Sequence, residues 1–251
     1  MTVQAKDFQQ NDFKVTQRAS GISVSVKEYL DDQVEKILTH RSVNHPFLNW
    51  YATNKLTKIQ EKQLYLETNA YFKFLPFYVA NISTITRDEA VLREVLHNSV
   101  DELGTQKSHS DIFAQFLAML GISEDDIDTY KPCQSSIDLN EGIREIYNTP
   151  PLERALGALF ADETQSAAMC ARYNEGLKNQ GYDARTRHFW ELHIEAEIGH
   201  SNAIYNILGP YVTDEQGRKL FEEGIAQYLT LMERFWDNIE ARLNESEIEC
   251  A

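Results

Sequence analysis

Apolar residues recur every three or four positions along most of this chain, which is the spacing that gathers them on one face of an α-helix. Alternating runs of β-branched residues bounded by hairpin turns are absent, and so is any internal repeat. The pattern therefore predicts an all-α protein, a bundle of about seven helices. The expected helices run from about Ser25 to the residue before "NHPF", and then over residues 57–82, 88–103, 109–120, 138–147, 152–178, 184–208 and 214–244.

Local signals refine this picture at the front of the chain. Thr57 is a typical N-cap, and Gln60 completes a capping box with it. Pro76 lies inside the long helix that follows, so this helix is expected to bend or tighten there, because proline lacks an amide hydrogen. Residues 1–24 are polar and aperiodic and are expected to form a flexible lead-in. No linker divides the rest, so residues 25–251 are expected to form a single helical domain.

Composition excludes several classes of partner. The chain has 39 acidic and 24 basic residues and a formal charge of −15, which argues against nucleic acid and against an anionic membrane surface. No apolar run approaches the roughly 20 residues needed to span a bilayer, and the polar start lacks the apolar core of a secretory signal. Three scattered cysteines do not make a disulfide framework. We expect a cytosolic protein that binds a small-molecule substrate, with a homodimer as the default assembly.

The segment "RHFWELHIEAEIGHS", residues 187–201, carries the clearest chemical signal. On a helix, His193, Glu197 and His200 lie within about 60° of one another. The same side carries Phe189, Trp190, Ala196, Ile204 and Ile207, whereas Glu191, Glu195 and Asn202 fall on the opposite side. Burying a carboxylate beside two imidazoles costs on the order of several kcal/mol unless a partner neutralises them, and a divalent metal ion is the usual partner. The alternative is a core histidine paired with Glu197 alone.

Three more ionisable side chains share a face with apolar residues. Glu163 is in register with Phe160 and Cys170, and His109 is in register with Phe113 and further apolar residues. Glu102 lies at the edge of an apolar face made by Leu92, Val95, Leu96, Ser99 and Leu103. These side chains are therefore expected to point inward, Glu102 less clearly than the other two.

Other histidines are expected to be surface or capping residues. Glu94 and His97 form a Glu-x-x-His motif, which occurs in ferritin-like dimetal bundles. Both residues fall opposite the apolar face of their own helix, where charged side chains are normally solvated. His40, His45 and His188 carry no comparable pattern.

With these residues assembled, the chain resembles the haem-oxygenase-like diiron oxidases, a superfamily related to the chlamydial death-domain-associating protein and to the TenA- and PqqC-like proteins. The motifs that carry the resemblance are "ELGTQKSH", "FADE" and "HIEAEIGH", with "HPFLNWY" and "FLAMLGI" as weaker support. The resemblance covers residues 25–244. It implies a seven-helix haem-oxygenase-like bundle with six metal ligands: Glu102, His109, Glu163, His193, Glu197 and His200.

The resemblance also implies the chemistry. Two Fe(II) ions, the second of them labile, would bind and reduce O2 as a co-substrate, and a small amino-acid-like or fatty-acid-like substrate would be desaturated, cleaved or N-oxidised. Glu102, His109 and His200 are assigned to one iron and His193 and Glu197 to the other, with Glu163 bridging. Aromatic residues of the long helix would either line the pocket or pack in the core: Tyr65, Tyr71, Phe72 and Phe74.

The sequence departs from the family pattern in one ligand. Glu197 stands where the family often has aspartate, so the longer side chain can reach or bridge differently. Gly104, between Glu102 and His109, is expected to weaken a helix there by roughly 1 kcal/mol relative to alanine and to mark a mobile metal-binding helix.

Two rival functions use the same fold or the same composition. Metal-free enzymes that resemble thiaminase II use a cysteine nucleophile, for which Cys170 is the candidate, and a cofactor-free oxidase acts in quinone biosynthesis. A metal-free hydrolase has no evident need for three buried histidines in register. A non-enzymatic acidic interaction module is the other alternative, and its binding would survive replacement of His193.

Overall fold

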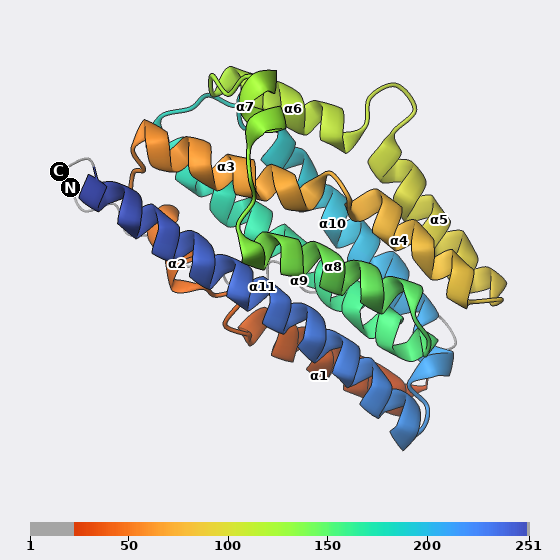
Figure 1. Ribbon diagram of the computed structural model, residues 1–251. Coiled ribbons are helices and arrows are strands. Elements are labelled where there is room, and N and C mark those ends of the chain that lie inside the picture. The colour runs from red at the N-terminus through yellow and green to blue at the C-terminus, as the bar shows by residue number, and fades with distance from the viewer. Residues whose placement is uncertain (1–22, 250–251) are drawn as a thin grey trace.

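The computed structural model describes residues 23–249, which form an α-helical bundle without a strand in that range (Figure 1). This confirms the predicted all-α class. The predicted flexible lead-in lies outside the described residues, apart from the start of the first helix. The helices are α1 (Val24–Thr39), α2 (Pro46–Tyr51), α3 (Lys58–Phe72), α4 (Leu75–Ile85), α5 (Glu89–Leu103), α6 (His109–Met119), α7 (Glu124–Thr129), α8 (Gln134–Asn148), α9 (Leu152–Gln180), α10 (His188–Ile207), the 3-10 helix η2 (Gly209–Tyr211) and α11 (Glu215–Glu249).

The helices within residues 23–249 outnumber the seven expected, for identifiable reasons. The long helix predicted around Pro76 is two helices, because α3 ends at Phe72 and α4 begins at Leu75. Pro76 lies in the first turn of α4, where a missing amide hydrogen leaves no hydrogen bond unmade. The short helices α2 and α7 span six residues each, too few for a hydrophobic period to show. The capping box of Thr57 and Gln60 is present as predicted.

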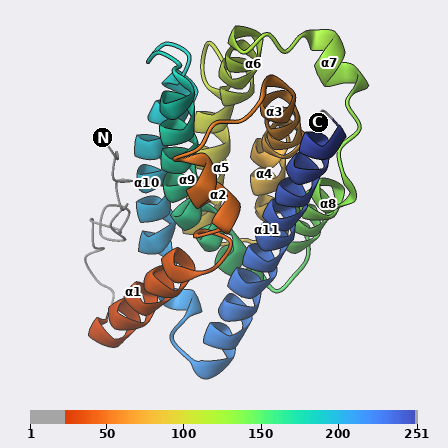
Figure 2. The ribbon, with the colours of Figure 1, turned by 90° about the vertical axis from the view of Figure 1, so that its left-hand side faces the viewer.

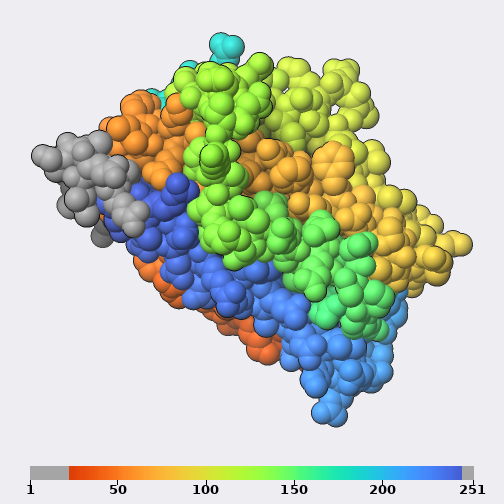
Figure 3. Space-filling view, viewed as in Figure 1, coloured from red at the N-terminus to blue at the C-terminus, as the bar shows by residue number. Residues whose placement is uncertain are grey.

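The long helix α9 runs through the middle of the bundle. Every residue from Ala155 to Tyr173 is buried, although the segment contains charged side chains. α10 and α11 both pack along α9, and Figure 2 shows them on different sides of it. In the space-filling view, α3, α8 and α11 lie against one another across one face (Figure 3). The charged residues of α9 are therefore enclosed by neighbouring helices.

Two glycines let α9 and α11 approach closely. A Cβ atom at Gly157 would lie 2.0 Å from the carbonyl oxygen of Phe221, and one at Gly224 would lie 1.9 Å from that of Arg154. Any side chain at either position would collide with backbone, so the crossing requires glycine on both helices. Of the helices described, none is both long and apolar enough to cross a membrane.

Candidate metal centre

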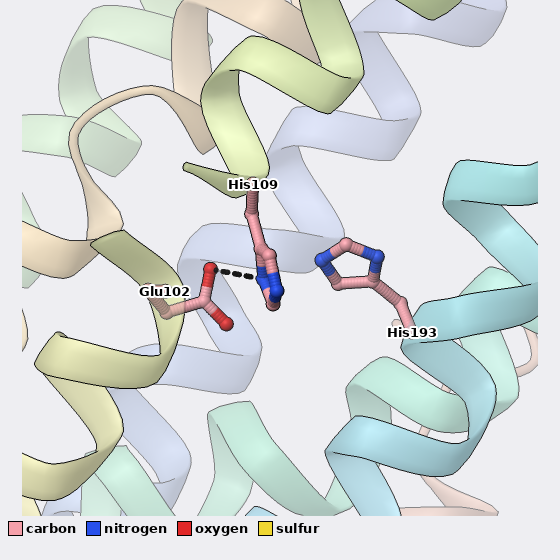
Figure 4. Close-up of side chains that lie close together, drawn as sticks. All are labelled: Glu102, His109 and His193. Atoms are coloured by element: carbon pink, nitrogen blue, oxygen red, sulfur yellow. Dashed lines mark hydrogen bonds and ion pairs between the residues drawn. The ribbon is translucent and has the colours of Figure 1, made fainter. Parts of the chain in front are cut away.

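The six side chains predicted as ligands gather between four helices. Glu102 comes from α5, His109 from α6, Glu163 from α9, and the remaining three from α10. Figure 4 shows Glu102, His109 and His193 pointing toward one another from three different helices. A cavity reaches the group and is lined by every member except His200, which contacts Glu163 and Glu197 directly. The structure thus brings all six predicted residues together.

A tight loop positions Glu102 against His109. Gly104 has φ +61° and ends α5, and a Cβ atom there would lie 2.0 Å from the carbonyl oxygen of Lys107. Ser108 then caps α6 through a capping box with Asp111, so His109 is the first residue of the new helix. The expectation that Gly104 weakens a helix is wrong, because the glycine lies outside any helix and makes the turn possible.

Glu102, His109 and His193 form the first compact group. His109 Nδ1 lies 2.9 Å from Glu102 Oε2, and the two imidazole rings have their centroids 4.5 Å apart. His193 Nδ1 donates to the carbonyl oxygen of Phe189 at 2.7 Å, which leaves the lone pair of Nε2 free. Burial lowers the pKa of His193 to about 4, so the ring is neutral at pH 7. One ligand atom from each residue lies within 4.8 Å of the others, close enough to share an ion.

A second group consists of Glu102, Glu197 and His200, again with ligand atoms within 4.8 Å of one another. His200 Nδ1 lies 3.3 Å from Glu163 Oε2 and 3.8 Å from Glu197 Oε2. Burial alone would lower the pKa of His200, but these two carboxylates raise it to about 12. Burial raises the pKa of Glu197 well above its usual range. Protons or cations are thus needed to neutralise this pocket.

Two buried atoms at the centre of the cluster have no hydrogen bond. These are Glu163 Oε2 and His200 Nδ1, which face each other across the second group. Buried polar atoms are normally hydrogen-bonded, so two such atoms that meet only as an ion pair at 3.3 Å call for an explanation such as a bound ion. Nitrogen and carboxylate oxygen together are the donor set that suits iron. The residues present therefore fit a divalent metal centre.

Two supporting residues were not identified from the sequence. His200 Nε2 donates to Asp101 Oδ2 at 3.0 Å, which fixes the ring with Nδ1 toward the cluster. Asn98 Nδ2 donates to Glu163 Oε1 at 2.6 Å. Asp101 is 52% exposed, so it resembles any solvated charge in the sequence. Asn98 lies one turn before Glu102, on the same buried face of α5 as Val91 and Val95. Its place on this apolar face could have identified it from the sequence as a residue that points inward.

We predict that Asp101→Asn weakens metal binding at the second group by about 10- to 100-fold, because the amide no longer fixes the orientation and basicity of His200 as a carboxylate does. Competitive titration with a chelating indicator dye measures this change. Glu94→Gln, on the same helix but away from the cluster, serves as the control. Equal affinities for the Asp101 variant and the control would contradict the assigned role.

The cavity wall is mostly apolar and aromatic. Phe72 lines it, as do Phe113, Phe189 and Met169. Tyr65 and Tyr71, considered as pocket residues from the sequence, are fully buried in the core, and Phe74 is 39% exposed. Tyr65 packs edge-on against Phe116, and the Tyr71 hydroxyl donates to Asp162. Of the four aromatic candidates, only Phe72 is among the wall residues of this cavity.

The histidines set aside from the sequence lie where predicted. His97 and His188 are exposed. His45 is buried and caps α2, its Nδ1 accepting from the backbone N–H of Phe47. Its Nε2 therefore carries the proton and donates to Asp237 at 3.1 Å, so it offers no lone pair to a metal. Glu240 lies close to His45 and Asp237, but both ring nitrogens of His45 are already hydrogen-bonded. We therefore interpret these three residues as a structural ion network and not as a metal site.

Three positions differ from the helical projections. Asn202, expected on a solvated face, is buried, because α10 is also covered on the side where Tyr205 donates to Asp31 of α1. Leu96 and Leu103, expected on an inward face of α5, are each 46% exposed. α5 packs against α4, α6 and α10, and these contacts leave both leucines partly exposed.

Comparison with known protein sequences places these residues in context. Residues 68–232 match the model of a protein family described as iron-containing redox enzymes. A 4-chloro-allylglycine synthase from Streptantibioticus cattleyicolor is 45% identical over 225 residues, which cover 90% of this chain and 88% of the relative. A 4-aminobenzoate synthase from Chlamydia pneumoniae is 26% identical over 88% of this chain and 96% of its own length.

Solved structures with low sequence identity share the fold. A CADD-like protein of unknown function from Nostoc punctiforme superposes with a TM-score of 0.75 at 15% identity, covering 88% of this chain and 99% of that chain. A domain with a haem-oxygenase-like fold from Shewanella denitrificans gives a TM-score of 0.72 at 19% identity, covering 90% and 97%. The predicted haem-oxygenase-like bundle is confirmed by these similarities.

Proposed function

Because this chain belongs to the family of iron-containing redox enzymes, we propose that its six-residue cluster binds two Fe(II) ions and uses O2 to oxidise a small amino-acid-like substrate. Family membership makes the protein an oxidoreductase. The observation that carries the proposal is the cluster of three histidines and three carboxylates, in which Glu163 Oε2 and His200 Nδ1 lie 3.3 Å apart, buried and without a hydrogen bond. Iron in such a shell would supply the electrons that reduce O2.

The geometry favours a distribution of ligands that differs from the one expected from the sequence. Glu102 takes part in both compact groups, so it is the better candidate for a shared ligand. His109 and His193 would complete one site, and Glu197 and His200 the other. Glu163 contacts His200 and would serve the second site.

The surrounding residues prepare this centre for oxidation chemistry. Burial keeps His193 neutral, and its hydrogen bond to Phe189 holds the ring with Nε2 toward the cluster. Burial would raise the pKa of Glu102, but the hydrogen bond from His109 and the nearby histidines lower it, so Glu102 is an anion at pH 7. The apolar wall excludes water and holds a carbon chain beside the metal ligands.

An amino-acid substrate is supported by the relative with 45% identity, whose name gives an amino acid, a chloro-allylglycine, as its product. A fatty acid is the alternative of the same chemical type. The homodimer and the cytosolic location stay predictions, since no comparison bears on them.

Oxygen consumption tests the proposed function. Protein reconstituted anaerobically with Fe(II) is mixed with O2 and a panel of aliphatic L-amino acids and fatty acids, and uptake is followed with an electrode. We expect one or more amino acids to accelerate uptake over the substrate-free rate, and metal-free protein to show none. Equal uptake with and without every compound on the panel would contradict an oxidase for these substrates.

Cys170 separates this proposal from a metal-free hydrolase. Its thiol lines the cavity, but burial raises its pKa well above the usual range, so little thiolate exists at pH 7. We predict that Cys170→Ser retains oxygen consumption within about threefold of the unaltered protein, because the thiol is not needed by an iron-dependent reaction. Steady-state uptake kinetics measure this. A loss of about 10³-fold with normal iron content would favour a nucleophilic cysteine.

A further inference from the structure

Three residues that line the cavity carry hydrogen-bond donors and reach the surface. Lys73 is exposed, Asn69 and Ser110 are half-buried, and all three line the cavity that reaches the metal cluster. Other lining residues are buried, including Glu163 and Cys170 of α9. The exposed residues therefore border the cavity mouth, and the buried residues line its interior.

The charges along the cavity are unevenly distributed. Apart from the histidines of the cluster, Lys73 is the one cationic side chain that lines it, whereas Asp162 and the cluster carboxylates lie deeper. Lys73 Nζ lies 5.0 Å from the ring centroid of Phe74 and forms no ion pair with another described residue. Other exposed lysines, such as Lys36 and Lys62, do pair with carboxylates. Lys73 is thus available to an anion from outside the protein.

Asn69 and Lys73 are four residues apart at the end of α3, so their side chains project from the same face. Ser110, in the first turn of α6, borders the same mouth. Neither Asn69 nor Ser110 forms a side-chain hydrogen bond with the rest of residues 23–244. An ammonium, an amide and a hydroxyl that have no ion pair or side-chain hydrogen bond within these residues are suited to the two oxygens of a carboxylate.

We propose that Asn69, Lys73 and Ser110 bind the carboxylate of the substrate at the cavity mouth, so that its carbon chain extends along Phe72, Phe113 and Phe189 toward the metal cluster. This assignment rests on the proposed function and deepens it, because it names the residues that hold the carboxylate that amino acids and fatty acids share. The carboxylate anchor also fixes which carbon atoms reach the metal ligands, and it thereby determines the position of oxidation.

Calorimetric titration without O2 tests the carboxylate site directly. The probes are L-norleucine, hexanoate and the carboxamide of each, titrated into Fe(II)-loaded and metal-free protein. We expect a carboxylate to bind about 10- to 100-fold more tightly than its carboxamide, and Lys73→Gln to remove this preference while Lys73→Arg keeps most of it. Lys219→Gln, an exposed lysine of α11, is the charge-matched control and should behave as the unaltered protein.

The possible outcomes separate this inference from the function on which it rests. Equal binding of carboxylate and carboxamide, binding of neither, or a preference that survives Lys73→Gln would overturn the carboxylate site. Preference for hexanoate over L-norleucine would support the site and assign it to a fatty acid instead of an amino acid. A protein that binds no iron fails the proposed function, and its metal-free titration still decides the role of Lys73.

Discussion

Glu102→Ala is expected to lose both iron ions and to lower oxygen consumption by at least about 10³-fold, because metal stabilisation worth several kcal/mol disappears with the shared ligand. Glu102 is the residue common to the two compact groups, and its carboxylate lies 2.9 Å from His109. Its side chain is 17% exposed and lies at the end of α5, so truncation leaves no large cavity in the core. Iron analysis after anaerobic loading and desalting measures the loss.

His193→Ala is the informative comparison for Glu102→Ala. His193 belongs to the first group only, so this variant should keep one iron per chain at the second group. Circular dichroism should show unchanged helix content for both variants. If Glu102→Ala retained one iron and His193→Ala retained none, the shared ligand would have been assigned to the wrong residue.

Gly157→Ala is expected to reduce the free energy of unfolding by about 3 kcal/mol, near the upper end for overpacking, and to lower Tm by about 10 °C. The added methyl group would lie 2.0 Å from the carbonyl oxygen of Phe221, which is backbone and cannot rotate away. α9 and α11 must then separate along their whole contact. Urea denaturation followed by circular dichroism gives the change.

Gly199 provides the matched control for Gly157→Ala. It also lies inside a helix, but a Cβ atom there would meet nothing within 4 Å. Gly199→Ala should therefore stabilise the protein by roughly 0.5–1 kcal/mol through helix propensity alone. A similar loss of stability in both variants would show that the close approach of α9 and α11 is not the reason why Gly157→Ala destabilises the protein.

The gathering of these ionisable residues in the interior could be predicted because their chemistry contradicts their surroundings. Glu163, His193 and His200 share helical faces with large apolar residues, and an ionisable group there needs a partner. That reasoning depends only on a period of 3.6 residues, which the sequence shows directly. The supporting contact of Asp101 could not be predicted, because it joins residues 99 positions apart and leaves Asp101 half-exposed.

The fold class was also predictable, whereas several details of packing were not. Periodicity located the long helices to within a few residues. It did not show that α3 ends at Phe72 and that a new helix, α4, begins at Leu75 with Pro76 in its first turn. A single face cannot describe α9, since neighbouring helices surround it and bury even its polar side. Leu96 and Leu103 show the converse, because apolar residues on one face of α5 face outward when no helix covers them.

Anaerobic titration of the metal-free protein with Fe(II), followed by metal analysis of the desalted product, tests the central claim most directly. Two iron ions per chain are predicted, one for each compact group around Glu102. Fewer than one iron per chain, with the helical fold intact, would contradict a metal centre at this cluster.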